Sequence, residues 1–399
     1  MRHGFLTKAC AAIGLVTLTT SPSSAVQGKA PGPSPFQIVW DKTYGSDVRS
    51  TEFRAITTAD NGDVFVAASE RDALDRSAAS PIRLLFWRID AAGRLVSETE
   101  IRKTRNSKGT NSASVRDVVA LGNGQALLLV DFEAGRPAIV RLDRNGKQTV
   151  TKELGRPGGG FATLLKIVPA PGGKFLLIGH ESFDGLLIEV DAAGNLLWET
   201  TDDRGKMEYF VDGIATSDGG FVLVGNSGQY DATRSGPSTV WVGRYDARGV
   251  LSTETTFPGR YGAIARTSTG GYAVAYDQSS KTNQEIRLKI LTADLKPASE
   301  APILDTTTAN FSEFKITPAG AGFIIGGRNH GRSYVTIVDE RGLEPTTFQG
   351  EAAPGTVDLG YSGLTDTTGG SFVLANSHIV VPPVNTPVRQ KVRLQKVAR

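Results

Sequence analysis

Short apolar segments alternate with glycine-containing turns along nearly the whole chain. The clearest example is TSDGGFVLVG at 216–225, where a turn precedes an apolar run. The run at 221–224 is rich in valine and has no helical period, so it predicts a β-strand. Asp218, Gly219 and Gly220 have the chemistry of a tight turn, because aspartate bonds its own backbone and glycine accepts positive φ. We therefore expect two strands joined by a hairpin.

A second type of turn follows in the same repeat. The segment 240–257 contains VWVGRYDARG and then VLSTETTF, so the D-x-x-G turn from Asp246 to Gly249 separates a third strand from a fourth. Both turns recur about every 50 residues, which is typical of four-stranded propeller blades. Copies of the first turn centre on Gly62, Gly124, Gly173, Gly271, Gly322 and Gly370. The D-x-x-G turn recurs from Asp90, Asp143, Asp191 and Asp339, with a degenerate copy at 292–295.

The two ends of the repeat array complement each other. The segment 38–43 has no strand before it, and its Trp40 aligns with Trp198 in the fourth strand of another repeat. The last repeat has its second and third strands at 371–376 and 391–397 and then ends. We expect 38–43 to complete this blade, which removes the exposed edges of an open array. The fold class is thus all-β, a single β-propeller of seven four-stranded blades, with six or eight as the alternatives.

The N-terminal segment differs from the repeats. Arg2 and Lys8 precede a short apolar stretch, and a small-residue cleavage site ends at Ala25. This pattern predicts a signal peptide at 1–25, a Pro- and Gly-rich linker at 26–36 and the propeller at 37–399, in a secreted or periplasmic protein. Cys10 is the only cysteine, so the mature chain has no disulfide.

Composition narrows the partners. The formal net charge of +3 falls to +1 when the signal peptide is removed, which gives no support for nucleic-acid binding. The apolar stretch near the N-terminus is too short to span a membrane. We expect a monomer that binds a protein or carbohydrate ligand and needs no cofactor.

The repeats resemble those of secreted bacterial β-propeller proteins. Residues 216–225 match the pattern T-x-D-G-G-[YF]-[IV]-[LV]-x-G, and VDAAGNLLW at 190–198 matches most of the pattern D-x-x-G-x-x-x-W. The resemblance covers most of the mature chain. It implies the architecture and says almost nothing about activity, because propellers serve many functions.

Polar residues follow the second strand of each repeat, on the face where the irregular loops lie. Irregular loops on a rigid scaffold are where binding sites are usually found. After His3, the three remaining histidines all lie at this kind of position. Our leading hypothesis is a non-enzymatic propeller that binds its ligand here. The expected ligand-binding residues are His180, Glu181, Asn226, Asp277, Asn329 and Asn376.

The alternative is a lyase acting on a polysaccharide that contains uronic acid. His330 and His378 lie in neighbouring blades and would serve as base or acid, Arg328 would neutralise a carboxylate, and Tyr230 would donate a proton. Tyr261 and Tyr276 are further candidates for the donor. No zinc or calcium motif is present.

A third hypothesis places function in the central channel. The basic residues Arg54, Arg116, Lys166 and Lys315 lie in the first strands. Because side chains alternate along a strand, half of such residues would face a neighbouring blade rather than the channel.

Overall fold

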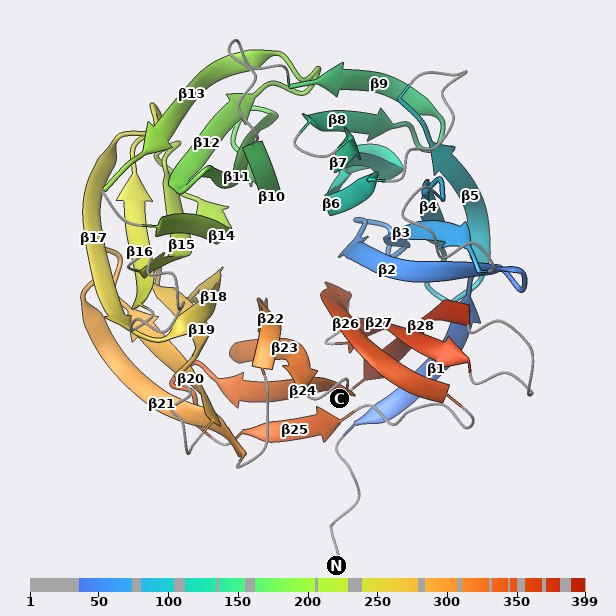
Figure 1. The fold of residues 1–399 in the computed structure, drawn as a ribbon. Coiled ribbons are helices and arrows are strands. Elements are labelled where there is room, and N and C mark those ends of the chain that lie inside the picture. Colours follow the sequence, from blue (N-terminus) through green and yellow to red (C-terminus); the bar gives the residue numbers. More distant parts are fainter. Residues whose placement is uncertain are drawn as a thin grey trace, which may run out of the picture. The chain divides into compact units, whose positions relative to one another are not determined.

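The computed structural model describes residues 36–73, 80–103, 112–133, 136–154, 162–204, 207–228, 239–278, 284–306, 311–329, 332–343, 345–349, 356–367, 371–380 and 389–398. These residues form seven antiparallel four-stranded sheets arranged as the blades of a ring (Figure 1). The predicted seven-bladed β-propeller is confirmed. Residues 1–35, which include the predicted signal peptide, lie outside the described part.

The first four blades follow one another along the chain, with the first strand of each blade innermost (Figure 1). Blade one is β2 (Arg49–Thr58), β3 (Val64–Asp72), β4 (Arg83–Ile89) and β5 (Leu95–Ile101). Blade two is β6 (Ser114–Leu121), the 3₁₀ turn η1 (Gly122–Gly124), β7 (Gln125–Glu133), β8 (Arg136–Leu142) and β9 (Gln148–Glu153). Blade three is β10 (Ala162–Ala170), β11 (Lys174–Glu181), β12 (Asp184–Val190) and β13 (Leu196–Asp202). Blade four is β14 (Met207–Ala215), β15 (Phe221–Gly228), β16 (Thr239–Tyr245) and β17 (Leu251–Pro258).

The remaining blades complete the ring. Blade five is β18 (Arg260–Arg266), β19 (Tyr272–Asp277), β20 (Gln284–Leu291) and β21 (Pro297–Thr306). Blade six is β22 (Phe311–Ala319), β23 (Gly322–Asn329), β24 (Arg332–Asp339) and β25 (Thr346–Gln349). Blade seven is β26 (Thr356–Thr367), β27 (Ser371–Val380), β28 (Arg389–Ala398) and, as its outer strand, β1 (Gln37–Tyr44).

The ring closes through β1 and β28, as the sequence predicts. The two strands are antiparallel, with Gln37 opposite Ala398 and Lys42 opposite Leu394. The Arg393 side chain on β28 donates to the Asp41 carboxylate on β1, with an Nε–Oδ1 distance of 2.9 Å. Phe36, just before β1, is buried and packs edge-on against aromatic rings of blades six and seven.

The core is divided among the interfaces between blades. The second and third strands are covered on both faces. A run without polar alternation, such as 221–224, is therefore fully buried. One cluster joins Leu176 and Ile178 of blade three to Phe221 and Trp241 of blade four. Each blade therefore stabilises its neighbours by burying the apolar face that a single sheet would expose.

The D-x-x-G turns serve the same interfaces. Gly93 has a φ of 77°, and a Cβ atom there would lie 2.9 Å from the ring of Trp40 on β1. Gly249 has a φ of 77° and would place its Cβ 2.6 Å from Trp198 on β13. The turn of each of these blades thus packs on the outer strand of the preceding blade, and glycine is needed both for the backbone conformation and for the close approach.

The degenerate turn of blade five keeps this geometry without glycine. Leu295 has a φ of 61° and is buried against the core between blades four and five. The Leu295 amide donates to the carbonyl of Thr292 at 3.0 Å, as the glycine amide does in the other turns. Burial of the leucine side chain offsets the cost of its left-handed backbone.

In the described ranges no helix is long and apolar enough to cross a membrane.

Candidate functional site

Bulges interrupt the first strands close to the face with the irregular loops. In blades one to five the pairing with the second strand skips one residue, and the skipped residues are Arg54, Arg116, Leu165, Val211 and Tyr261. A bulge redirects a side chain and increases the local twist. The bulged residues and the ends of the second strands therefore decide which side chains the inner part of this face presents.

In blade two the bulge aims an arginine at a buried acid. The Arg116 Nε lies 2.7 Å from Asp131 Oδ2. The side chain of Arg116 is 36% exposed and that of Asp131 only 2%. Burial raises the pKa of Asp131, and the charge of Arg116 opposes that rise. The Arg116 side chain is therefore accessible to solvent, while the Asp131 carboxylate that positions it is buried.

Next to this pair, blades three and four contribute a histidine and a tyrosine. The rings of His180 and Tyr209 meet edge to face, with centroids 4.5 Å apart. Burial lowers the pKa of His180, and the positive charge of Arg116 lowers it further, while a hydrogen bond with the Ser182 backbone raises it. His180 is thus held in its neutral form at neutral pH.

The same row of residues continues into blade five. Asn226 pairs with Tyr209 in the sheet of blade four, and its Oδ1 accepts a hydrogen bond from the Tyr261 amide at 2.9 Å. Arg260 lies 3.3 Å from the carboxylate of Asp277, measured from Nε to Oδ2. The Arg260 side chain is 49% exposed and that of Asp277 is 2%.

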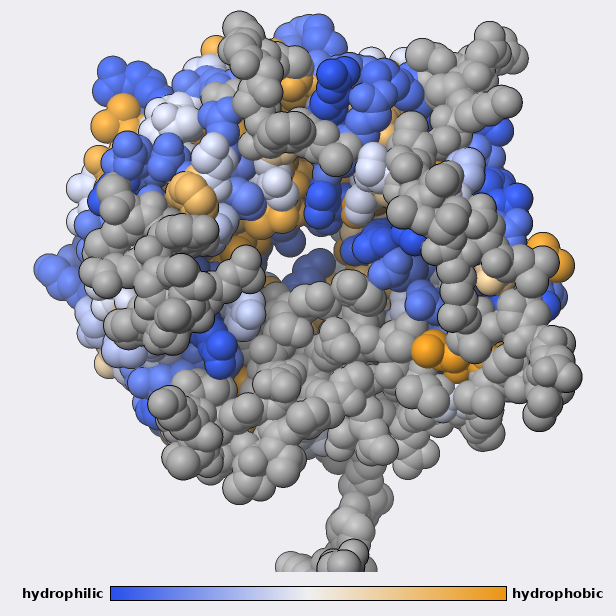
Figure 2. Space-filling view, viewed as in Figure 1, coloured by the Kyte–Doolittle hydropathy of each residue, from blue (hydrophilic) through white to orange (hydrophobic). Residues whose placement is uncertain are grey.

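These residues lie near the ends of the first and second strands of blades two to five. We call this group the inner-strand cluster. Its members are Arg116, Asp131, His180, Tyr209, Asn226, Arg260, Tyr261 and Asp277. Figure 2 shows an opening at the centre of the ring, with hydrophilic residues on the described part of its rim.

Three of the six predicted ligand-binding residues belong to this cluster, in different roles. His180 contributes its ring, Asn226 positions the Tyr261 backbone and Asp277 holds Arg260 from below. Glu181 is half-buried and follows His180, so it points to the other face of its strand. Asn376 is buried in blade seven, away from the solvent. Asn329 ends β23, and its side chain lies outside the described residues.

Of the principal lyase residues predicted, the structure describes the side chain of His378 alone. His330 and Tyr230 lie outside the described residues, and so does the side chain of Arg328. His378 is only 2% exposed. Burial lowers its pKa to about 4, helped by the charges of Arg393 and Lys391. A side chain enclosed in this way does not line an open cleft.

The expectation that the histidines share one position is wrong for His180 and His378. His180 lies five residues beyond Phe175, which begins the apolar run of β11, whereas His378 lies six residues beyond Phe372 in β27. Side chains alternate between the faces of a strand, so this difference of one residue sends the two rings to opposite faces.

Sequence reasoning missed Tyr209 and Arg260, and it assigned Arg116 to the channel. All three lie in first strands. The part of each first strand that carries these residues is far from the recurring turns, so the repeats could not be aligned there. A bulge leaves no mark in the hydrophobic pattern, so the register of these residues was not readable. The one available signal was the basic character of the first strands, which drew attention to Arg116.

The other two basic residues considered for the channel, Lys166 and Lys315, lie on β10 and β22. Lys166 Nζ lies 3.6 Å from Asp212 and 4.0 Å from Asp117, in the blades on either side. Burial lowers the pKa of Lys166, but these two carboxylates outweigh it and the net shift is upward. Lys315 Nζ lies 3.5 Å from the carbonyl of Ile56, and burial together with the charge of Lys166 lowers its pKa to about 8.

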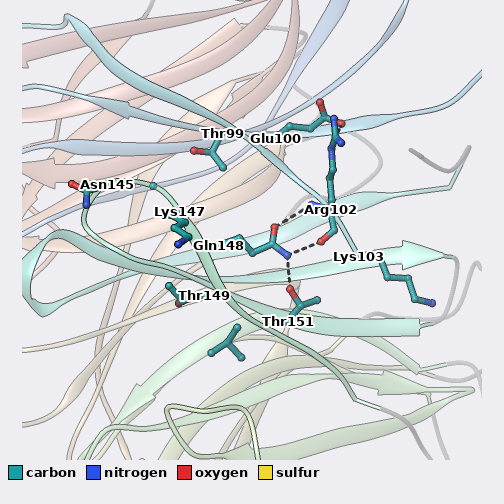
Figure 3. Close-up of a pocket in the computed structure, with 11 residues that line it drawn as sticks. Thr99, Glu100, Arg102, Lys103, Asn145, Lys147, Gln148, Thr149 and Thr151 are labelled. Atoms are coloured by element: carbon teal, nitrogen blue, oxygen red, sulfur yellow. Dashed lines mark hydrogen bonds and ion pairs between the residues drawn. The ribbon is translucent and has the colours of Figure 1, made fainter. Parts of the chain in front are cut away.

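A separate groove lies between the outer strands of blades one and two (Figure 3). It has a volume of about 660 Å³ and is bordered by β5 and by the turn that leads into β9. The Gln148 side chain spans it, donating to the Arg102 carbonyl at 2.6 Å and accepting from the Arg102 amide at 3.2 Å. Lys103 is paired with Glu153 at 2.8 Å. The polar groups of the groove thus bond to one another and hold the two blades together.

Metal binding has no support in the described ranges. There, no three histidine, cysteine, aspartate or glutamate side chains come together in a group able to hold an ion.

Comparison with known proteins finds similarity in structure alone. No protein-family model matches the chain. No curated protein matches its sequence. The chain is similar to the polysaccharide lyase Uly1, with a TM-score of 0.56 and 12% identity over 89% of this chain and 91% of that one.

Two further solved structures are similar to this chain to the same degree. A catalytically inactive histidine-to-alanine variant of virginiamycin B lyase from Staphylococcus aureus, with quinupristin, has a TM-score of 0.55 and 15% identity over 91% of this chain and 99% of that one. Drosophila Plexin A in complex with Semaphorin 1b has a TM-score of 0.54 and 10% identity, over 92% of this chain and 88% of that one. At these identities the similarity shows the propeller fold only.

Proposed function

We propose that the protein is an exported, non-enzymatic β-propeller that binds a glycan or a protein through the inner-strand cluster. The observation that carries this proposal is the layering of charge, with exposed guanidinium groups above buried carboxylates. Arg116 over Asp131 and Arg260 over Asp277 follow this pattern.

The same layering recurs in blade one, close to the irregular loops. The Glu70 carboxylate is buried, and the partly exposed Arg83 contacts it at 2.6 Å, although Arg83 also binds Glu100 at 3.2 Å and so has fewer free donors than Arg116 and Arg260. A buried carboxylate fixes each guanidinium, which has five N–H donors and uses only some of them for its partner. The donors left over suit a carboxylate or sulfate brought by a ligand, and the ordered arginine loses little entropy on binding.

Binding measurements on matched variants test the proposal. Arg116→Gln removes one exposed guanidinium, and Arg248→Gln removes another from a D-x-x-G turn on the opposite face, where the side chain is 84% exposed. Immobilised protein would be screened against acidic and neutral glycans and against proteins from the same compartment. We expect Arg116→Gln to weaken binding about tenfold and Arg248→Gln to leave it unchanged. Equal affinity in both variants would place the binding surface elsewhere.

Export is supported by the sequence of the first 25 residues, with its basic start, its apolar segment and its small-residue site. N-terminal sequencing of the protein recovered from the periplasm or the medium should begin at Val26. A chain that starts at Met1 and stays in the cytoplasm would contradict this part of the proposal.

A lyase remains the second candidate because the cluster contains suitable groups. His180 is neutral and contacts Tyr209, and Arg116 lies close enough for its charge to lower the pKa of His180. A neutral histidine, a tyrosine and an arginine would supply the base, the proton donor and the carboxylate partner for elimination on a uronic acid. The structural likeness to a polysaccharide lyase is consistent with this chemistry.

An activity assay separates the two candidates. Acidic polysaccharides would be incubated with the protein while the ultraviolet absorbance of unsaturated uronic-acid ends is followed. A lyase should generate these ends and lose activity in His180→Ala and in Tyr209→Phe. Binding without any release of unsaturated ends would leave the non-enzymatic function as the explanation.

A further inference from the structure

Tyr261 is held in a conformation that a bulky residue rarely adopts. Its φ is 51°, in the left-handed region, and its backbone amide is fixed by the side chain of Asn226 from the neighbouring blade. The residue is 43% exposed, so part of its ring is open to the solvent. Tyr272 and Tyr276 of the same blade are buried. Backbone strain at a residue whose ring stays partly exposed points to a function for that ring.

The neighbouring residue brings a positive charge to the same place. The guanidinium carbon of Arg260 lies 5.9 Å from the centre of the Tyr261 ring. The buried Asp277 holds the guanidinium through its Nε. The positioned cation therefore lies over one face of the partly exposed Tyr261 ring, at the edge of the inner-strand cluster.

From this arrangement we infer that Arg260 and Tyr261 form a subsite for one acidic sugar residue of a glycan. The sugar ring stacks on the Tyr261 ring, and its carboxylate binds the guanidinium of Arg260. The inference rests on the proposed function, since it specifies the ligand class of the same surface. Aromatic rings offer an apolar face with a polar edge, and arginine matches the planar geometry of a carboxylate.

The distribution of exposed apolar residues favours a glycan over a protein. A protein interface needs a contiguous apolar centre. Among the described residues, most of the exposed large hydrophobic side chains lie on or beside outer strands, away from the cluster. These are Ile38, Val39, Leu95, Val96, Leu196, Leu197 and Val250. Besides Tyr261, the exposed Phe183 of blade three lies near the cluster, because its carbonyl accepts a hydrogen bond from the Glu208 amide next to Tyr209. The surface therefore offers isolated aromatic rings among charges.

Titration calorimetry on the full chain tests the subsite with two probes of equal size. One is a short oligomer of galacturonic acid, and the other is its methyl ester, which keeps the sugar rings and removes the charges. Tyr261→Gly deletes the aromatic ring and relieves the left-handed strain, so a loss of binding cannot be attributed to unfolding. Arg260→Gln deletes the charge, and Arg248→Gln on the opposite face is the control.

We expect Tyr261→Gly to weaken both probes about five- to tenfold, because the stacking contact does not depend on charge. Arg260→Gln should weaken the acid at least tenfold and leave the ester unchanged, which removes the preference for the acid. The control should bind as the unmodified protein does.

Other outcomes overturn the subsite and separate its failure from that of the proposed function. If Arg116→Gln weakens binding while both subsite variants bind normally, the cluster is the binding surface and the subsite is wrong. If the cluster binds a purified protein and neither oligomer, the ligand class is wrong. If neither the cluster variants nor the subsite variants change any binding, both proposals fail.

Discussion

Replacing Gly93 with alanine should loosen the contact between blade one and the strand that closes the ring. Gly93 lies in a D-x-x-G turn with a φ of 77°, and its added Cβ would lie 2.9 Å from the Trp40 ring on β1. Trp40 has little freedom to move, because its Nε1 donates to the Ala91 carbonyl at 3.0 Å and its side chain is largely buried. The substitution therefore combines backbone strain with overpacking.

The two contributions can be separated with Gly62→Ala in the same blade. Gly62 has a φ of 82°, and a Cβ there would meet its nearest atom only at 3.8 Å. Left-handed backbone costs an L-residue about 1–2 kcal/mol. The smaller entropy of the unfolded chain returns about 0.4–1 kcal/mol. Gly62→Ala should thus destabilise by about 1 kcal/mol, and Gly93→Ala by about 1–3 kcal/mol more through overpacking.

Urea unfolding followed by tryptophan fluorescence measures the difference. Both variants should unfold with the same dependence on urea concentration as the unmodified protein, so that their midpoints rank their stabilities. If Gly62→Ala and Gly93→Ala lose equal stability, the close approach to Trp40 contributes nothing. Our account of why these turns need glycine would then reduce to backbone conformation alone.

Three further substitutions test buried charges. Folding lowers the pKa of His378 from 6.5 to about 4, so the unfolded chain binds the extra proton more tightly. The free energy of unfolding should therefore fall by about 3 kcal/mol as the pH drops from above 6.5 to 4. His378→Phe should flatten the urea midpoint over that range, and an unchanged slope would refute the assignment. Arg393→Met should cost about 1–2 kcal/mol by removing the donor to Asp41 on β1, and a double-mutant cycle with Asp41→Asn should recover a coupling of similar size. Lys166→Met should cost about 1–3 kcal/mol because it leaves two carboxylates facing each other, and adding Asp212→Asn should restore part of the loss; a further loss would contradict the ion triad.

The architecture was readable from the sequence because it depends on turns that repeat. The period of about 50 residues, the four strands per repeat and the pairing of 38–43 with the last blade all follow from local signals. Even the degenerate turn ending at Leu295 keeps its geometry, because its hydrogen bond does not require glycine.

The site was less predictable because it depends on register. A shift of one residue reverses the face to which a side chain points, and this separates His180 from His378 although both lie near the end of a second strand. The bulges at Arg116 and Tyr261 lie within strands whose residue composition does not differ from that of the other strands. The sequence therefore did not indicate them. It did indicate which strand ends carry polar residues, but the set of residues that meet there required the structure.

The pairing of β1 with β28 has a consequence for biosynthesis. The strand that is made first is the one that must wait longest for its partner, because nearly the whole chain separates the two. Until then β1 has an unpaired backbone beside Ile38 and Val39, which stay exposed even in the folded ring, and this combination favours association with other strands. Asp41 and Lys42 place charges in the middle of the strand, which disfavours such pairing during the wait. The final blade can form only after the ribosome has finished β28.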